Sequence, residues 1–573
     1  YVLNRLSVTT KGGQGGALEV ARARILIVRA VFLVLYCVVA VRLFDVMIIQ
    51  NINIDGEFGV PSPTHVDAQK QGVSAPWGDI VDRNDVLLAT SLRTASLYAD
   101  PKNILDPEAS AKQLAVIFPE TSYGVFLKKM QKNGRFIWLK RGVTPSDQAA
   151  ILKIGEPGLG FRDENKRLYP QGDISAHIVG YGNLDGQGLM GLERSFQGAL
   201  SGSLKGRALK TTLDIRIQHA LRTEMQTSME KFKAKGAAGI IMDAQAGEVL
   251  AMVSLPDFDP HAPTSSGKNA QFNRVTQGVY ELGSVFKIFS TAAFLETQDN
   301  ALTQTFDATK PLKRGRYTIR DFHAEKRVLT IPEIFMHSSN IGTALMGETI
   351  GGEELQRFYK KLGLLTKPDV AFSEVGKPLY PRPWRDINTL TASYGHGIAV
   401  SPMQLVTAVS AVVNGGYKVT PRFVLPENEN TQTAIKEQII SSETSNVMKS
   451  LMKLVVTDGT AKKAAVEGYA VGGKTGTAEK PGKNGYDRKK LISSFVGAFP
   501  IDDPKYVLFV MLDEPKGIPE TYGYATAGWT AAPIFSSVMK RIVSIEAIEP
   551  DLMKQNAQSG KQPVSNASYG DGL

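Results

Sequence analysis

Ser284-Val285-Phe286-Lys287 is the stretch that decides the interpretation of this chain, because it places a hydroxyl and an amine at positions i and i+3. On a helix, side chains at this spacing share one face and come within hydrogen-bonding reach. A serine hydroxyl is a weak nucleophile that needs an adjacent base. A lysine acts as that base when desolvation or a nearby cation lowers its pKa. The spacing therefore predicts that Ser284 is a nucleophile and that Lys287 is its base.

Two further motifs follow in order along the chain. Ser338-Ser339-Asn340 begins 54 residues after Ser284, and Lys474-Thr475-Gly476-Thr477 begins 136 residues after Ser338. The first offers a hydroxyl for proton relay and an amide that can hold a substrate carbonyl. The second is expected to form a strand with a cation, two hydroxyls and a glycine that lets a substrate backbone lie close. Each motif alone is common by chance, but the ordered set predicts an acyl-transfer site.

Apolar runs on both sides of these motifs predict the fold. Residues 239–242 and 249–253 flank Gly247-Glu248, as two strands flank a hairpin turn. Residues 495–499 and 506–512 are strand-like runs after the third motif. Strands, then helices, then strands indicate an α+β fold in which helices cover both faces of an antiparallel sheet. The basic segment 480–490, which follows the third motif and precedes these runs, is expected to be a solvated hairpin loop.

The ordered motifs resemble those of penicillin-binding proteins and serine β-lactamases. The resemblance is to class B penicillin-binding proteins in particular, and it covers most of residues 75–545. The segments that carry it are 80–84, 135–141, 167–170, 176–180, 191–193, 393–397 and 521–533. Trp77-Gly78 departs from the Arg-Gly usual in the class, and Leu282 stands where the class has proline. The resemblance implies a transpeptidase domain that follows a pedestal domain, in which His177 and Glu193 are structural.

The resemblance also implies a reaction, peptidoglycan D,D-transpeptidation. Ser284 would attack the bond between the terminal D-alanines of a donor stem peptide, and a second stem peptide would then take the acyl group. The backbone N–H groups of Ser284 and Thr477 would form the oxyanion hole. β-Lactam antibiotics would acylate the same serine, and no metal or organic cofactor is required. The implied catalytic residues are Ser284, Lys287, Ser338, Asn340 and Lys474, and the implied substrate-binding residues are Thr475, Gly476 and Thr477.

Protonation states follow from these roles. Lys287 must be neutral to accept a proton, whereas Lys474 must be charged to attract a carboxylate. His396, in the glycine-rich segment 393–397, is expected to have a structural or cleft-lining role, because Lys287 already fills the role of base.

Two other functional classes stay open. A β-lactam-hydrolysing or β-lactam-sensing relative would share the motifs, although the Glu-x-x-Leu-Asn segment of class A β-lactamases does not occur here. A division scaffold without catalysis would need none of the motif residues, and all are present. Rapid turnover of benzylpenicillin would favour the hydrolase.

Residues 25–49 predict a membrane anchor. This largely apolar stretch contains Arg29, Arg42 and Asp45, and would span about 37 Å as a helix. A basic flank precedes it, so the positive-inside rule predicts a cytoplasmic N-terminus and an exported body. A cleaved signal peptide and a buried core helix are the weaker alternatives. Because the resemblance is to proteobacterial division members of the class, it implies a single-pass inner-membrane protein with a periplasmic catalytic domain, acting at the division septum. It also implies the SEDS-type glycan polymerase FtsW and other division proteins as partners.

Composition fits an exported enzyme with a large core. The chain has 573 residues, of which 43% are hydrophobic, and a net charge of +10. A single cysteine, Cys37, excludes an intrachain disulfide and a cysteine-based metal cluster. The absence of zinc-finger spacing, a phosphate loop and an aromatic-basic stripe argues against nucleic-acid binding. The expected segments are a cytoplasmic arm (1–24), the anchor (25–49), a linker (50–74), the pedestal domain (75–222), the transpeptidase domain (223–545) and a disordered tail (546–573).

Overall fold

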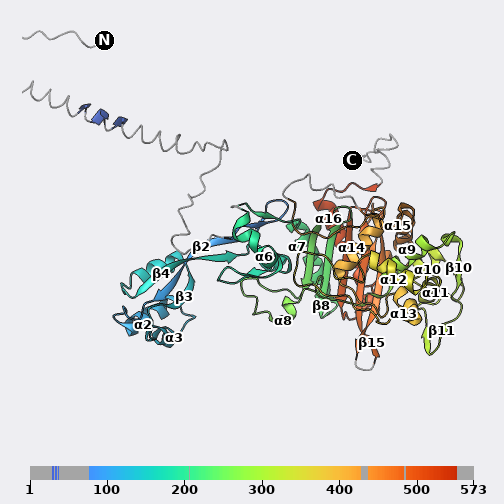
Figure 1. Ribbon diagram of the computed structural model, residues 1–573, viewed down its shortest axis with the longest axis horizontal. Coiled ribbons are helices and arrows are strands. Elements are labelled where there is room, and N and C mark those ends of the chain that lie inside the picture. Colours follow the sequence, from blue (N-terminus) through green and yellow to red (C-terminus); the bar gives the residue numbers. More distant parts are fainter. Residues whose placement is uncertain are drawn as a thin grey trace, which may run out of the picture. The chain divides into compact units, whose positions relative to one another are not determined.

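The computed structural model describes residues 77–204, 207–426, 437–482 and 485–551, together with helical residues 29–30, 32–34 and 36–37 (Figure 1). The chain divides into two units, residues 1–73 and 74–573. Among the residues that the structure describes, no helix has the length and apolarity needed to cross a bilayer. Most of the predicted anchor (25–49), the whole predicted linker (50–74) and most of the predicted tail (546–573) lie outside the described residues.

The pedestal is built on a mixed sheet with helices against one side. Its strands have the order β3-β2-β1-β7, and β4 also pairs with β2. Leu97, Leu114 and Phe126 are fully buried between this sheet and its helices. The elements are β1 (Ile80–Val81), β2 (Leu87–Ala99), α2 (Pro107–Ile117), α3 (Tyr123–Met130), β3 (Ile137–Val143), α4 (Pro145–Leu152), β4 (Leu159–Leu168) and β7 (Leu209–Lys210).

Short elements connect this sheet to the catalytic part of the chain. They surround a buried ion pair in which Arg167 Nε donates to Glu193 Oε1 over 2.7 Å, and the Arg167 guanidinium lies 5.7 Å from the Trp77 ring. His177 is also buried, and burial lowers its pKa to about 4. The burial of His177 and Glu193 fits the structural role that the resemblance implies for them. The elements are η3 (Gly172–Ser175), α5 (Ala176–Val179), β5 (Tyr181–Gly182), β6 (Gly188–Met190), α6 (Gly191–Ser195) and η4 (Ala199–Ser203).

A five-stranded antiparallel sheet forms the centre of the catalytic part, with the order β14-β15-β16-β8-β9. Residues 506–512 of its middle strand are all buried, so both faces of the sheet are covered. The two early apolar runs lie in β8 and β9 and the two late runs in β15 and β16, which confirms the predicted α+β arrangement. The strands are β8 (Gly236–Asp243), β9 (Val249–Leu255), β14 (Gly472–Gly482), β15 (Gly485–Phe499) and β16 (Tyr506–Asp513).

Two groups of helices cover the sheet. One consists of α7 (Ile215–Lys231) and α16 (Ala531–Ile545), which pack on each other and on the strands. The other includes α9 (Lys287–Thr297), α14 (Pro402–Val413) and α15 (Ser442–Thr457). The remaining elements are α8 (Gly267–Gln271), η5 (Gly283–Phe286), η6 (Ala301–Thr303), β10 (Thr305–Asp307), β11 (Leu312–Arg314), β12 (Tyr317–Ile319), β13 (Val328–Thr330), α10 (Ile331–Met336), α11 (Asn340–Ile350), α12 (Gly352–Lys361), α13 (Asp386–Ser393), η8 (Lys462–Ala464) and η9 (Pro519–Thr521).

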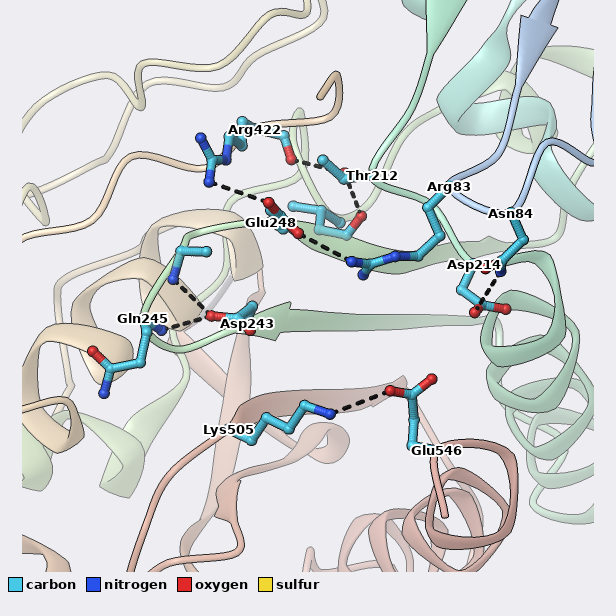
Figure 2. Close-up of polar contacts among 12 residues, drawn as sticks. Arg83, Asn84, Thr212, Asp214, Asp243, Gln245, Glu248, Arg422, Lys505 and Glu546 are labelled. Carbon is cyan, nitrogen blue, oxygen red and sulfur yellow. Dashed lines mark hydrogen bonds and ion pairs between the residues drawn. The ribbon is translucent and has the colours of Figure 1, made fainter. Parts of the chain in front are cut away.

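Polar contacts join the pedestal to the catalytic sheet (Figure 2). Glu248, in the turn between β8 and β9, lies between Arg83 of the pedestal and Arg422, at 3.4 and 3.1 Å. Asn84 Nδ2 donates to Asp214 Oδ2 at the start of α7 over 2.9 Å. Segment 80–84 therefore contributes directly to the junction through Arg83 and Asn84.

The segment 480–490 forms a solvent-exposed hairpin, as expected, but its described residues lie in two paired strands and not in a loop. Its residues belong to β14 and β15, apart from residues 483–484, which are outside the described residues. The pairing of the two strands runs as far as Gly482 opposite Gly485. The sequence predicts only the apolar half of β15 as strand, because the other half contains charged residues that face solvent.

Candidate active site

Ser284 lies in the single 3₁₀ turn η5, which leads directly into α9 at Lys287. The helical spacing of the two residues is as predicted, although the first turn is 3₁₀ and not α. Lys287 is fully buried, whereas Ser284 is half-buried. This arrangement leaves the hydroxyl accessible while the amine is desolvated.

Lys287 makes its polar contacts with the second motif. Its Nζ lies 2.5 Å from Ser338 O, 3.1 Å from Ser338 Oγ and 2.8 Å from Asn340 Oδ1. The direct hydrogen bond expected between Ser284 and Lys287 is not found among the described residues. The Lys287 amine is instead held by three oxygen atoms, two of Ser338 and one of Asn340.

The conformation of the second motif is set by the backbone of Ser338 and by hydrogen bonds to Asp321. Ser338 has φ +61°, a left-handed conformation that costs a non-glycine residue about 1 kcal/mol or more. The next residue, Ser339, caps α11 and donates from Oγ to Asp321 Oδ2 over 2.8 Å. Asp321 Oδ1 also accepts the backbone N–H of Ile341 over 2.9 Å. Asp321 therefore fixes the turn that presents Ser338, a role that sequence interpretation missed.

Lys474, in β14, reaches the same hydroxyl from the other side. Its Nζ lies 2.9 Å from Ser338 Oγ, and its side chain is fully buried. Burial lowers the pKa of Lys474 to about 7. Burial, together with the charge of Lys474, holds the pKa of Lys287 well below its ordinary value, and Asp321 opposes this shift.

The hydrogen-bond geometry is satisfied by one charged and one neutral lysine. A neutral Lys287 amine has two hydrogens, which Ser338 O and Asn340 Oδ1 accept, and one lone pair, which faces Ser338 Oγ. The Ser338 hydroxyl can then donate to Lys287 and accept from the Lys474 ammonium. Because two adjacent buried charges of like sign repel, this distribution is favoured over two ammonium groups. Ser338 Oγ is thus a proton bridge between the two amines.

The third motif is held close to η5, the turn that contains Ser284; η5 is called the nucleophile turn from here on, after the role predicted for Ser284. A Cβ on Gly476 would lie 2.3 Å from Leu282 O and 2.6 Å from Val285 Cγ2. The glycine is therefore required by the packing of β14 against η5. The close approach of a substrate backbone, which the sequence predicts for Gly476, stays a prediction. The Thr475 hydroxyl lies 2.8 Å from Thr460 Oγ1, and Thr477 Oγ1 accepts the Ala527 N–H over 3.1 Å.

The glycine-rich segment supports the nucleophile turn from behind. Gly395 has φ +82°, and a Cβ there would lie 2.0 Å from Gly283 O. The His396 ring packs on Tyr486 with centroids 4.3 Å apart, and its Nδ1 lies 3.8 Å from Glu281 Oε2. Among the described residues, His396 has no polar contact with the two lysines or Ser338. The structural or cleft-lining role expected of His396 stays a prediction.

Within the described part of the chain, no group of three or more histidine, cysteine or acidic side chains has the geometry to hold a metal ion. The described site brings together the Lys287 amine, the Lys474 amine and the Ser338 hydroxyl that lies between them.

Two models of known protein families match this chain. A model of the penicillin-binding protein transpeptidase domain matches residues 237–540, and a model of the penicillin-binding protein dimerisation domain matches residues 73–228. The chain belongs to the class B penicillin-binding proteins. The region called the pedestal above corresponds to the dimerisation domain of these proteins, and both matches agree with the resemblance found in the sequence.

Individual penicillin-binding proteins and peptidoglycan D,D-transpeptidases are similar to this chain over most of its length. The probable peptidoglycan D,D-transpeptidase FtsI of Caulobacter vibrioides is 37% identical over 489 residues, which cover 82% of each chain. The probable peptidoglycan D,D-transpeptidase PenA of Neisseria gonorrhoeae is 30% identical over 84% of this chain and 86% of its own. The crystal structure of penicillin-binding protein 3 from Mycobacterium tuberculosis, complexed with aztreonam, has the same fold, with a TM-score of 0.65 and 24% identity over 83% of this chain and 97% of that one.

Proposed function

We propose that this penicillin-binding protein is a peptidoglycan D,D-transpeptidase that cross-links stem peptides through an acyl-enzyme on Ser284. The observation that carries the proposal is Ser338 Oγ, which lies 3.1 Å from Lys287 Nζ and 2.9 Å from Lys474 Nζ. Relatives that share most of the chain are named peptidoglycan D,D-transpeptidases. A site with this proton bridge supports both transfer of the acyl group from the donor to Ser284 and its transfer from Ser284 to the acceptor.

Acylation uses the neutral Lys287 amine. Ser284 Oγ attacks the carbonyl carbon of the donor's terminal D-Ala-D-Ala bond, and its proton passes to Lys287 Nζ, whose lone pair turns from Ser338 Oγ towards Ser284 Oγ when the donor is bound. Collapse of the tetrahedral intermediate breaks the C–N bond, and the leaving amine receives a proton through the Ser338 hydroxyl. Lys474, when protonated, stabilises the Ser338 oxygen during this relay and attracts the donor's terminal carboxylate. Asn340, Thr475 and Thr477 complete donor binding, and Gly476 keeps β14 against the nucleophile turn.

Transfer reverses the proton path. The acceptor's amine attacks the ester carbonyl of the acyl-enzyme and loses a proton through Ser338, while Ser284 Oγ leaves and recovers its proton from Lys287. One C–N bond forms and one C–O bond breaks, so the enzyme returns to its starting state. β-Lactams enter the first half-reaction because they mimic the donor terminus, and their bulky acyl group resists the second.

The test is transfer to an amine. The full-length protein is incubated with a thioester analogue of a D-Ala-D-Ala donor and an amino-acid acceptor, and the products are separated by mass. The proposal predicts an amide-linked transfer product in addition to hydrolysis. Hydrolysis alone, accompanied by rapid turnover of benzylpenicillin, would instead identify a β-lactam-hydrolysing relative, and no reaction at all would leave the non-catalytic scaffold.

We propose further that the protein is a single-pass inner-membrane protein of the division septum. The support is the apolar stretch 25–49 with its basic flank, and the name FtsI of the relative from Caulobacter. In this arrangement residues 1–24 are cytoplasmic, residues 50–74 link the anchor to the body, the pedestal (75–222) and the transpeptidase domain (223–545) are periplasmic, and residues 546–573 form a C-terminal tail. FtsW and other division proteins would be the partners.

The septal proposal has its own test. Residues 25–49 are replaced by an unrelated membrane helix, and cells that lack the native copy are imaged. Filamentous cells in which penicillin labelling of the variant is intact would support a specific role of the anchor in docking FtsW. Normal division and midcell placement would contradict that role.

A further inference from the structure

The ribbon formed by β14 and β15 extends past the rest of the catalytic sheet (Figure 1). β15 pairs with β16 only as far as Ile492, opposite Asp513, whereas its pairing with β14 continues to Gly485, opposite Gly482. Because β14 also contains the Lys474–Thr477 motif, the ribbon is a direct continuation of the strand that lines the active site.

The ribbon is fixed to the start of the nucleophile turn. The Tyr486 hydroxyl donates to both carboxylate oxygens of Glu281, at 2.9 and 3.1 Å, and Glu281 precedes Ser284 by three residues. On the other edge of the ribbon, Lys480 Nζ lies 2.7 Å from Asp513 Oδ1 and 3.0 Å from Glu514 Oε1. These contacts hold the ribbon beside the active site and neutralise Lys480.

Three consecutive cations bulge out of the anchored ribbon. Glu479 pairs with Leu491, and the next β14 residue, Lys480, pairs with Asp487. Arg488-Lys489-Lys490 therefore has no partner on β14, and all three residues are exposed. Bulges redirect side chains and are common beside active sites. We name this segment the basic bulge.

Nearby acids neutralise the basic bulge only weakly. Lys490 lies 3.2 Å from Asp487 in an exposed pair, and Arg488 lies 3.9 Å from Glu479 with 90% of its side chain exposed. Exposed pairs of this kind contribute little. Lys489 makes no ion pair with any described residue. The basic bulge thus presents cations that are free to bind an anionic ligand.

The basic bulge is within reach of a peptide at the active site. Glu479 follows Thr477 by two residues, or about 7 Å along a strand. An extended peptide of four or five residues spans roughly 13–17 Å. A peptide with one end at Ser284 can therefore contact the basic bulge with the other.

We propose that the basic bulge binds the carboxylates of the acceptor stem peptide, an acidic peptide, during the second half-reaction. This inference rests on the proposed transpeptidase function. The donor's carboxylate is already assigned to the Lys474–Thr477 motif, so the basic bulge serves the acceptor. By holding the acceptor's amine at the ester carbonyl, the basic bulge favours transfer over hydrolysis by water.

The experiment measures how the acyl-enzyme partitions between transfer and hydrolysis. The full-length double variant R488E/K489E is compared with the wild type and with K360E/K361E, which makes the same charge change at two exposed residues at the end of α12. Each protein receives the thioester donor and one of two acceptors: a tripeptide amine with free carboxylates, or the same peptide with every carboxylate amidated.

For the acidic acceptor, the transfer-to-hydrolysis ratio of R488E/K489E is expected to fall at least about fivefold, because each reversal removes an attraction and adds a repulsion. The loss should shrink in about 0.5 M salt, which screens exposed charges. The ratio for the amidated acceptor, the rate of penicillin acylation and all properties of K360E/K361E should stay within about twofold of wild type.

Three results would overturn the assignment: an unchanged ratio in R488E/K489E, an equal fall with the amidated acceptor, or an equal fall in K360E/K361E. Failure of the proposed function is a different result, because the wild type itself would then give no transfer product with either acceptor.

Discussion

Replacing Gly476 with alanine tests whether β14 sets the position of the nucleophile. The added Cβ would lie 2.3 Å from Leu282 O, and a tolerable contact requires at least 3.0 Å. It would also lie 2.6 Å from Val285 Cγ2, so the added methyl group would collide with the segment that contains Ser284 at two atoms. Overpacking of this kind costs about 1–3 kcal/mol of stability. A displacement approaching 1 Å at reacting atoms costs about a hundredfold in rate.

We therefore expect Gly476→Ala to lower the second-order rate of penicillin acylation by about ten- to a hundredfold. The free energy of unfolding should fall by about 1–3 kcal/mol. Stopped-flow labelling with a fluorescent penicillin and chemical denaturation measure the two effects. Gly482→Ala is the matched control, because it lies on the same strand and, among the described residues, the nearest atom to its Cβ would be Gly485 O at 3.2 Å. Acylation by Gly476→Ala within about threefold of wild type would refute the reasoning.

Three further predictions concern the proton network. The acylation rate should fall as pH rises through about 7, because Lys474 then loses its charge, and it should also fall in acid, because Lys287 becomes protonated. Lys474→Arg should remove the fall at alkaline pH. A wild-type rate that keeps rising above pH 8 would contradict the assigned protonation states. Lys287→Arg replaces the neutral amine with a guanidinium that stays charged and cannot accept a proton, so penicillin labelling should be lost, and near-normal labelling would exclude Lys287 as the base. Asp321→Ala removes two hydrogen bonds at the start of α11 and should cost about 1–2 kcal/mol in denaturation while slowing acylation, whereas unaltered acylation would show that Asp321 does not position Ser338.

The sequence was informative where chemistry or periodicity is local. The three motifs were recognised from residue type and order, and the structure brings Lys287, Ser338 and Lys474 into one hydrogen-bonded group. The strands of the catalytic sheet were recognised because buried strands are continuous apolar runs.

The features that were missed depend on contacts between distant parts of the chain. Lys287 bonds to the second motif because the left-handed backbone at Ser338 turns its carbonyl and hydroxyl towards the amine, and no local pattern reports that backbone angle. Asp321 lies in the loop between β12 and β13, where it has no motif or periodicity to distinguish it. The first half of β15 is held by Tyr486 and its contact with Glu281, 205 residues earlier, so its charged sequence alone resembled a loop.

The central claim is that Ser284 is the residue that carries the acyl group. The most direct measurement is digestion of the protein after reaction with a fluorescent penicillin, followed by mass spectrometry of the labelled peptide. We predict that the adduct is found on Ser284 alone, and that Ser284→Ala is unlabelled while its thermal stability stays within about 1 kcal/mol of wild type. An adduct on Ser338, an adduct on Ser493 (a buried serine of β15) or undiminished labelling of Ser284→Ala would contradict the account.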